Sequence, residues 1–219
     1  QSKTVKQMWS TVETLRGFAA SAFGRGADAI YIFNNFMIPY KTQTLRPDGT
    51  LSYSDDRQEA LRELGSLSTA LGKPRTHVLT YADPDLKPEP KPTPTLPQGE
   101  TKNFDIHIGP KPDKGRCTVH VALESCSGFE AADLSVTVNG AACRRLADLP
   151  RDPRYTYDST RVWHVVKAVA ETGARVIPFS VELTALKDGY NRIGITNGKS
   201  AAQELTWLEI HLSPAEVTP

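Results

Sequence analysis

The stretch Leu134-Ser-Val-Thr-Val-Asn-Gly140 alternates apolar and polar residues and then ends in Asn-Gly. Successive side chains of a strand point to opposite faces of the sheet, so this alternation predicts a strand with one buried and one wet face. Asn-Gly favours a two-residue hairpin turn, because both residues of such a turn take positive φ and Asn and Gly tolerate that conformation. The stretch therefore predicts the centre of an antiparallel sheet.

The same alternation recurs on both sides of this hairpin. The other predicted strands are Phe104–Ile108, Val119–Leu123, Ala141–Leu146, Val162–Val166, Val176–Leu183, Asn191–Thr196 and Leu205–Leu212, with a further turn at Lys187-Asp-Gly189. About eight short strands within about 115 residues are typical of a two-sheet sandwich. Residues 98–219 are therefore expected to form an all-β sandwich of the jelly-roll type.

Residues 83–97 differ in composition from the rest of the chain. Their prolines are Pro84, Pro88, Pro90, Pro92, Pro94 and Pro97. Proline fixes φ and lacks a backbone donor, so this stretch predicts an extended linker of polyproline II type. The alternative is a proline-rich ligand for an aromatic groove on another protein.

Before the linker, the periodicity changes to that of a helix. Apolar residues follow helical spacing from Val5 to Phe23 and stop at Gly24-Arg-Gly26, which predicts an amphipathic helix with a glycine cap. The nearly unbroken apolar run Ala27–Asn34 then predicts a strand covered on both faces, as in a parallel sheet.

A loop over Asn35–Ser54 and a second helix with leucines at 61, 64, 67 and 71 are expected next, before a weak strand candidate at His77–Tyr81. Residues 1–82 thus predict an α/β segment with one strong parallel strand and no neighbours for it. An upstream segment, a companion chain or a second copy is expected to complete that sheet, and Gln1 at the start agrees with a missing upstream part. Expressed separately, residues 1–82 should aggregate or remain molten, whereas residues 98–219 should fold cooperatively.

Two groups of motifs resemble known families. Residues 18–35, with Ala27-Asp-Ala-Ile-Tyr-Ile-Phe-Asn34, and the later Leu61-Arg-Glu-Leu-Gly65 resemble the last helix–strand–helix of the (β/α)8 barrels of bacterial glycoside hydrolase-like proteins. Ala29 stands where that pattern has glycine. The resemblance implies that residues 1–82 close a TIM-type barrel.

Val136-Thr-Val-Asn-Gly140 and Leu186-Lys-Asp-Gly-Tyr-Asn191 resemble turns of the galactose-binding-like domain that often follows such barrels. The two resemblances together imply the carboxyl-terminal portion of a secreted or periplasmic carbohydrate-active protein, with a polysaccharide or oligosaccharide as partner. Glycosidases use a pair of carboxyl groups, which in barrels usually come from earlier strands, so this chain should not be catalytic alone. The alternative is a non-catalytic carbohydrate-binding or adhesion module with residues 1–82 as a docking segment.

Candidate glycan contacts lie where a barrel strand would end and on the sandwich. Asn34, Asn35, Tyr40 and Tyr53 follow the predicted strand 27–34, and amides and tyrosines can bond and stack on sugars. Trp163 and Trp207 are candidate platforms for sugar rings. The alternatives are local capping by Asn34 and packing of the tryptophans against a companion domain.

A set of polar residues falls on the faces opposite the predicted core: Asp105, His107, His120, Trp207, Glu209 and His211. Histidines and a carboxylate would suit a divalent metal if their strands were neighbours, but exposed histidines are far more common than ligands, so no metal is expected. Ser125-Cys-Ser-Gly128 is not a nucleophile elbow, and no P-loop, GxGxxG or HExxH motif occurs. We expect neither catalytic residues nor a cofactor in this chain.

Charge and composition restrict the partners. The 219 residues carry 26 Lys and Arg against 25 Asp and Glu, a net charge of +1, so neither nucleic acid nor an anionic membrane surface is an expected partner. No apolar run is long enough to span a bilayer. Cys117, Cys126 and Cys143 allow at most one disulfide and do not indicate a redox compartment.

Overall fold

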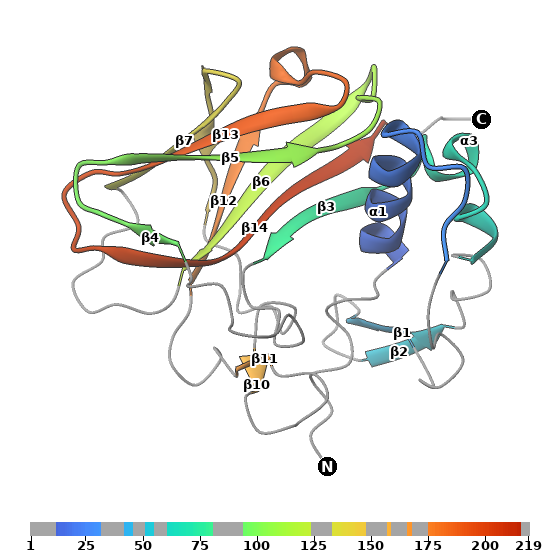
Figure 1. Ribbon diagram of the computed structural model, residues 1–219. Helices are drawn as coiled ribbons and strands as arrows, with labels where there is room; N and C mark the ends of the chain where they lie inside the picture. The colour runs from blue at the N-terminus through green and yellow to red at the C-terminus, as the bar shows by residue number, and fades with distance from the viewer. Residues whose placement is uncertain are drawn as a thin grey trace.

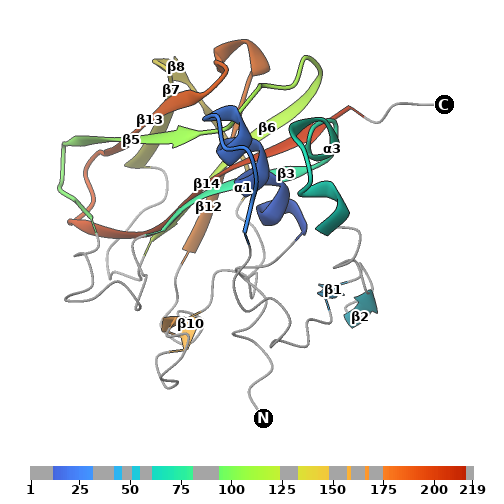
Figure 2. The ribbon, with the colours of Figure 1, turned by 45° about the vertical axis from the view of Figure 1, so that its right-hand side comes forward.

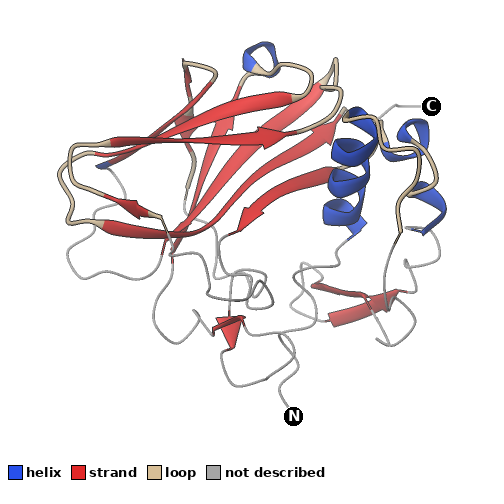
Figure 3. Ribbon diagram, in the orientation of Figure 1, coloured by secondary structure: helices blue, strands red, loops and turns tan. Residues whose placement is uncertain are grey.

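Two antiparallel β-sheets packed face to face form the centre of the part of the protein that the structure describes (Figure 1). The structure is a computed structural model that describes residues 12–31, 42–45, 51–54, 61–80, 94–123, 133–147, 157–158, 166–167 and 175–215. Figure 3 shows that strands dominate and that the helices α1 and α3 lie together at one side of the sheets. The predicted all-β sandwich is thus supported at the level of a two-sheet β fold.

The larger sheet has six strands in the order β3-β14-β6-β12-β9, with β4 also paired to β14. Their bounds are β3 Arg75–Thr80, β4 Thr95–Leu96, β6 Gly115–Leu123, β9 Arg144–Arg145, β12 Arg175–Val181 and β14 Gln203–Pro214. The smaller sheet has four strands in the order β5-β13-β7-β8. Its strands are β5 Thr101–His107, β7 Leu134–Val138, β8 Ala141–Ala142 and β13 Tyr190–Asn197. All of these pairings are antiparallel, as predicted.

The core lies between the two sheets and follows the predicted alternation. In β7, residues 134, 136 and 138 are buried while 135 is exposed, and in β14 Leu208, Ile210 and Leu212 are completely buried. These side chains belong to one apolar cluster that also contains Phe104, Ile193 and residues of every long strand of both sheets. Burial of this cluster supplies the main driving force for folding.

The Asn-Gly hairpin is confirmed. Asn139 has φ 51° and Gly140 has φ 87°, and they join the paired strands β7 and β8. Gly189, in the second predicted turn, has φ 78° and precedes β13. Both turns therefore use residues that tolerate the left-handed region.

Helix α1, Val12–Gly24, confirms the helical pattern over the described part of that prediction. Its chain reverses at Gly26, whose φ is 89° and whose amide donates to the carbonyl of Phe23. Ala19 and Ala20 are fully buried, and α1 packs along β3. Figure 2 shows α1 in front of the ends of β3 and β14. No helix among the described residues has both the length and the apolar surface needed to cross a membrane.

The predicted second helix is interrupted. Residues 61–63 are helical, and a separate short helix α3, Leu67–Ala70, begins after Ser66, whose side chain accepts from the amide of Thr69. Gly65 and the Ser66 cap break the leucine periodicity, because a serine hydroxyl that caps one helix cannot lie inside another.

The strand prediction for residues 27–34 is wrong over residues 27–31, which are not in a strand, and Tyr31 is 84% exposed. Residues 32–34 lie outside the described residues. An apolar run forms a buried strand only where other strands cover it, and none of the described strands pairs with residues 27–31. The (β/α)8 barrel segment is therefore not seen in the structure.

The loop predicted over 35–54 contains two paired strands. β1, Thr42–Leu45, pairs antiparallel with β2, Leu51–Ser54, around the turn signal at 46–50. β10, Tyr157–Asp158, and β11, Val166–Lys167, form a further two-residue pair, so the predicted strand 162–166 is described only at its last residue. The remaining residues of both predictions lie outside the described part of the chain.

The weak strand candidate before the linker is β3, and it belongs to the larger sheet. β3 pairs with β14 from Arg75 opposite Leu212 to Thr80 opposite Trp207. β4 lies within the predicted linker 83–97 and also pairs with β14, at Gln203 and Glu204, so the polyproline II prediction is wrong at residues 95–96. The domain bounds 1–82, 83–97 and 98–219 stay a prediction. β3, before residues 83–93, and β4, after them, both pair with β14.

Candidate functional site

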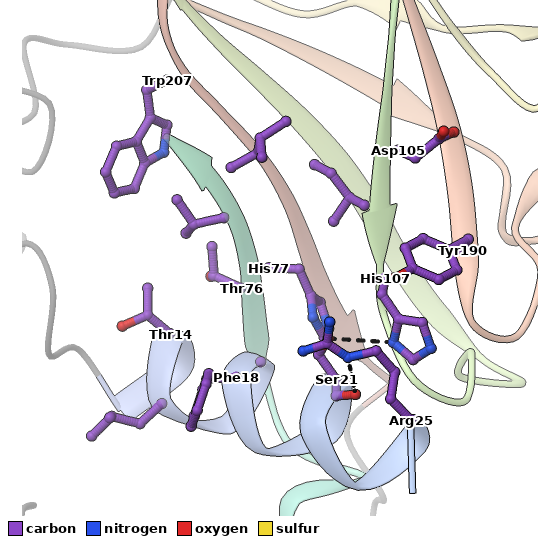
Figure 4. A pocket seen from close by; sticks show the side chains of 15 residues that line it. Thr14, Phe18, Ser21, Arg25, Thr76, His77, Asp105, His107, Tyr190 and Trp207 are labelled. Carbon is purple, nitrogen blue, oxygen red and sulfur yellow. Dashed lines mark hydrogen bonds between the residues drawn. The ribbon is translucent and has the colours of Figure 1, made fainter. Parts of the chain in front are cut away.

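A pocket of about 500 Å³ opens at the side of the sandwich between the edge strands of the two sheets. β3 is the edge of the larger sheet and β5 the edge of the smaller one, and α1 forms a third wall (Figure 4). We call this the edge pocket. Its chemically active lining consists of Ser21 and Arg25 from α1, His77 from β3, His107 from β5, Tyr190 from β13 and Trp207 from β14.

Glycines bring α1 close enough to form this wall. A Cβ on Gly17 would lie 1.9 Å from the carbonyl oxygen of Thr76 in β3. Gly109, just after β5, has φ 64° and would place a Cβ 2.4 Å from the carbonyl oxygen of Ala20. Only residues without a side chain allow helix and sheet backbones to approach this closely.

His107 is held at the mouth of the edge pocket. The amide of Gly109 donates to its Nδ1 at 3.2 Å, so in the neutral ring the proton sits on Nε2. The Ser21 hydroxyl lies 3.3 Å from the same Nδ1, and Tyr190 packs edge-on with ring centroids 4.8 Å apart. Partial burial, and then the charge of Arg25, lower the pKa of His107.

His77 is buried in the wall of the same pocket. It is 3% exposed, and neither ring nitrogen has a hydrogen-bond partner among the described residues. Burial is the largest cause that lowers the pKa of His77 to about 3, and the charges of Arg75, His107 and His211 act in the same direction. His77 is therefore a neutral imidazole whose donor and acceptor are both unused, which is uncommon for a buried polar group.

Asp105 lines the other side of the pocket, but its carboxylate is already bound. Arg192 donates to Asp105 from Nε at 3.0 Å and from Nη2 at 3.1 Å. These hydrogen bonds are the main cause that lowers the pKa of Asp105. Figure 4 shows Asp105 away from Ser21, His77 and His107.

This geometry suits binding more than catalysis. A hydrolytic triad needs a histidine with one nitrogen on the nucleophile and the other on an orienting acid. Here Ser21 and the Gly109 amide share the same Nδ1 of His107, and Asp105 bonds Arg192. Among the described lining residues, Asp105 is the one carboxylate, whereas a glycosidase needs two.

Of the residues predicted to contact glycan, the structure brings Trp207 to the edge pocket. Trp207 is 3% exposed, and its Nε1 donates to Glu209 Oε2 at 2.9 Å. Tyr53 lies in β2 opposite Gln43, and its side chain is outside the described set. Asn34, Asn35, Tyr40 and Trp163 lie outside the described residues.

Sequence reasoning missed Ser21, Arg25, His77 and Tyr190. The sequence shows locally that Ser21 and Arg25 are one helical turn apart and share a helix face, and that His77 lies inside the strand Arg75–Thr80. No local signal shows that α1, β3 and β5 meet.

The condition that a histidine and a carboxylate lie on neighbouring strands is met in the larger sheet. His120 of β6 lies opposite Glu209 of β14, with 2.7 Å between His120 Nδ1 and Glu209 Oε1. His211 instead faces Thr76 at 2.8 Å and Ser213 at 3.0 Å. Within the described ranges, no group of three or more His, Cys, Asp or Glu residues is placed to hold a metal.

Comparisons with known proteins give partial likenesses only. No family model matches the sequence, and no curated protein matches it. Among solved structures, a β-porphyranase of glycoside hydrolase family 86 from the human gut bacterium Bacteroides plebeius matches with a TM-score of 0.41 and 10% identity over 64% of this chain. A variant of BuGH86 and wild-type BuGH86, both in complex with neoagarooctaose, match with TM-scores of 0.41 and 0.40, identities of 16% and 15%, and 66% and 67% of this chain covered. The match covers 20% of each of those chains, so this chain spans about a fifth of their length.

Proposed function

We propose that this chain is the carboxyl-terminal, non-catalytic part of a carbohydrate-active, glycoside hydrolase-like protein, and that the edge pocket binds a saccharide unit. The observation that carries the proposal is the composition of the pocket: the aromatic rings of Phe18, Tyr190 and Trp207 line it together with hydroxyl, imidazole and guanidinium groups. Sugars have apolar faces that stack on rings and hydroxyl edges that need donors and acceptors. A volume of about 500 Å³ is in the range of pockets for small ligands.

In this proposal, residues 1–82 complete a (β/α)8 barrel supplied by an upstream segment or companion chain, and residues 98–219 form a galactose-binding-like sandwich of a secreted or periplasmic protein. Catalytic carboxylates would belong to the upstream part. The single lining carboxylate among the described residues, held by Arg192, agrees with a binding role for this part.

The alternative is a non-catalytic carbohydrate-binding or adhesion module, with residues 1–82 as a docking segment. The close approach of α1 to β3, and the pairing of β3 with β14, favour it because they attach the first segment to the sandwich directly. The two proposals differ in whether the isolated chain is complete. A monodisperse chain with a single cooperative thermal transition supports the module, whereas association that an upstream barrel segment relieves supports the barrel.

Saccharide binding is tested by calorimetric titration of the full chain with neutral and acidic oligosaccharides, neoagarooctaose among them. Tyr190 is 59% exposed at the pocket, and a stacked ring contributes about 1 kcal/mol, so Tyr190→Ala should weaken binding about fivefold to tenfold. Tyr31→Ala is the matched control because Tyr31 is exposed and does not line the pocket. Absence of binding to every sugar, or equal affinities for Tyr190→Ala and the native chain, would contradict the proposal.

A further inference from the structure

Positive charge at the edge pocket exceeds negative charge. Arg25 lines the pocket and Arg75 adjoins it in β3, next to His77. The carboxylate of Asp105 is taken up by the two hydrogen bonds from Arg192. The described residues around the pocket therefore leave two guanidinium groups without a carboxylate partner.

Arg75 is the more unusual of the two because it is 1% exposed. Its Nη2 donates to the carbonyl of Pro110, and its Nε has no hydrogen-bond partner among the described residues. Burial lowers the pKa of Arg75 to about 10, so the group remains charged at pH 7. A buried charge is stabilised chiefly by a counter-charge, and the described part of the chain offers none here.

His77 adds hydrogen-bonding capacity at the same place. Its ring lines the pocket, is almost wholly buried, and has two unused nitrogens. Ser21 and Arg25 of α1 line the same pocket as His77, and Ser21 contacts His107 there (Figure 4). A neutral imidazole can donate one hydrogen bond to an anionic oxygen without opposing charge.

We propose that the edge pocket binds an oxyanion group, a carboxylate or a sulfate, with Arg25 as its charged partner and His77 as a neutral hydrogen-bond donor. If the pocket binds a saccharide, as proposed above, the ligand is an acidic one. The fork of Arg25 matches the paired oxygens of such a group, and its exposed side chain can turn toward them. Arg75, two residues from His77 in the same strand, adds a fixed positive potential.

The experiment compares D-glucuronate, D-glucose and inorganic sulfate on the full chain at constant ionic strength, with the ring signals of His77 followed by NMR. D-glucuronate and D-glucose differ at one carbon, a carboxylate in place of a CH₂OH, so their affinity ratio isolates the charge. We expect D-glucuronate to bind at least about tenfold more tightly than D-glucose, and sulfate to shift the His77 signals at the same site.

Arg25→Gln should reduce D-glucuronate affinity about tenfold and D-glucose affinity much less, because glutamine keeps hydrogen-bond donors but removes the charge; Arg25 is exposed, so its loss should not affect folding. Arg116→Gln removes an equally exposed arginine from β6, outside the lining, and is the matched control. Equal binding of D-glucuronate and D-glucose would overturn the anion site and leave saccharide binding in place. Sulfate binding that Arg25→Gln weakens, with no binding of either D-glucuronate or D-glucose, would uphold the anion site and refute the saccharide function.

Discussion

His77 shows how one residue links stability to pH. Its folded-state pKa, about 3, lies below the ordinary value of 6.5 given for an unfolded chain, because burial disfavours the charged ring. Between these two values the unfolded state binds a proton that the folded state does not bind. The stability that His77 contributes is therefore complete above about pH 6.5 and is lost as the pH falls toward 3.

We predict that the free energy of unfolding falls by about 1.4 kcal/mol per pH unit from this group below pH 6, and that His77→Phe removes that slope. Urea unfolding at a series of pH values gives the free energy of unfolding of the native and His77→Phe chains, and the pH dependence of their difference is the predicted slope. A difference that stays constant with pH would show that His77 is protonated in the folded state.

Asn191 is a neutral side chain whose burial makes its hydrogen bonds important for stability. It is 0% exposed, its Oδ1 accepts from the Lys187 amide at 2.9 Å and from Asn139 Nδ2 at 2.8 Å, and its Nδ2 donates to the carbonyls of Lys187 and Gly189. Asn191→Ala leaves these groups unpaired, so we predict a loss of about 2–3 kcal/mol in thermal or urea unfolding. Asn103→Ala, at an exposed position of β5, should change stability by less than about 0.5 kcal/mol.

At the scale of elements, the contact of α1 with β3 decides whether the edge pocket has its third wall. Helix propensity alone predicts that Gly17→Ala stabilises α1 by about 0.5–1 kcal/mol. The added Cβ would stand 1.9 Å from the Thr76 carbonyl oxygen, so we predict instead a loss of about 1–3 kcal/mol. Thermal unfolding of the native and Gly17→Ala chains shows whether the substitution stabilises or destabilises the protein.

Gly65→Ala is the control for this prediction, because its Cβ would meet the Arg62 carbonyl oxygen at 3.4 Å, close to an ordinary contact. It should be nearly neutral. A Gly17→Ala chain that is more stable than the native one would mean that α1 does not pack on β3 as described.

The whole molecule depends on β14, which pairs with β3 on one side and β6 on the other. A chain of residues 83–219 lacks α1 and β3 and leaves one edge of β14 unpaired along Trp207–Leu212. Unpaired edges are templates for association. We predict that this shortened chain loses at least about 3 kcal/mol of stability, or about 6–12 °C in Tm, and self-associates in sedimentation experiments. Independent, monomeric folding of residues 98–219 with native stability would agree with the sequence expectation and contradict the role given to β3.

Sequence by itself determined the long strands β5, β6, β7, β12, β13 and β14, the alternation of their core residues and the Asn139-Gly140 turn. These features depend on periodicity and backbone preference over a few neighbouring residues. The predicted single strand 141–146 was wrong, because β8 joins the smaller sheet and β9 the larger one. The same local reasoning failed at residues 27–31, because whether an apolar run becomes a buried strand depends on partners elsewhere in the chain. Sequence reasoning named Trp207, which lines the edge pocket, as a candidate sugar contact, but it did not name His77 or Ser21.

Only the tertiary structure decided that β3 joins the larger sheet and that α1 closes the edge pocket. Ser21 meets His107 across 86 positions of sequence, and Thr76 meets His211 across 135. Such contacts are selected by the packing of whole elements and leave no periodic trace in the residues that make them. The long strands could therefore be predicted from the sequence, whereas the pocket between them depends on how distant elements pack.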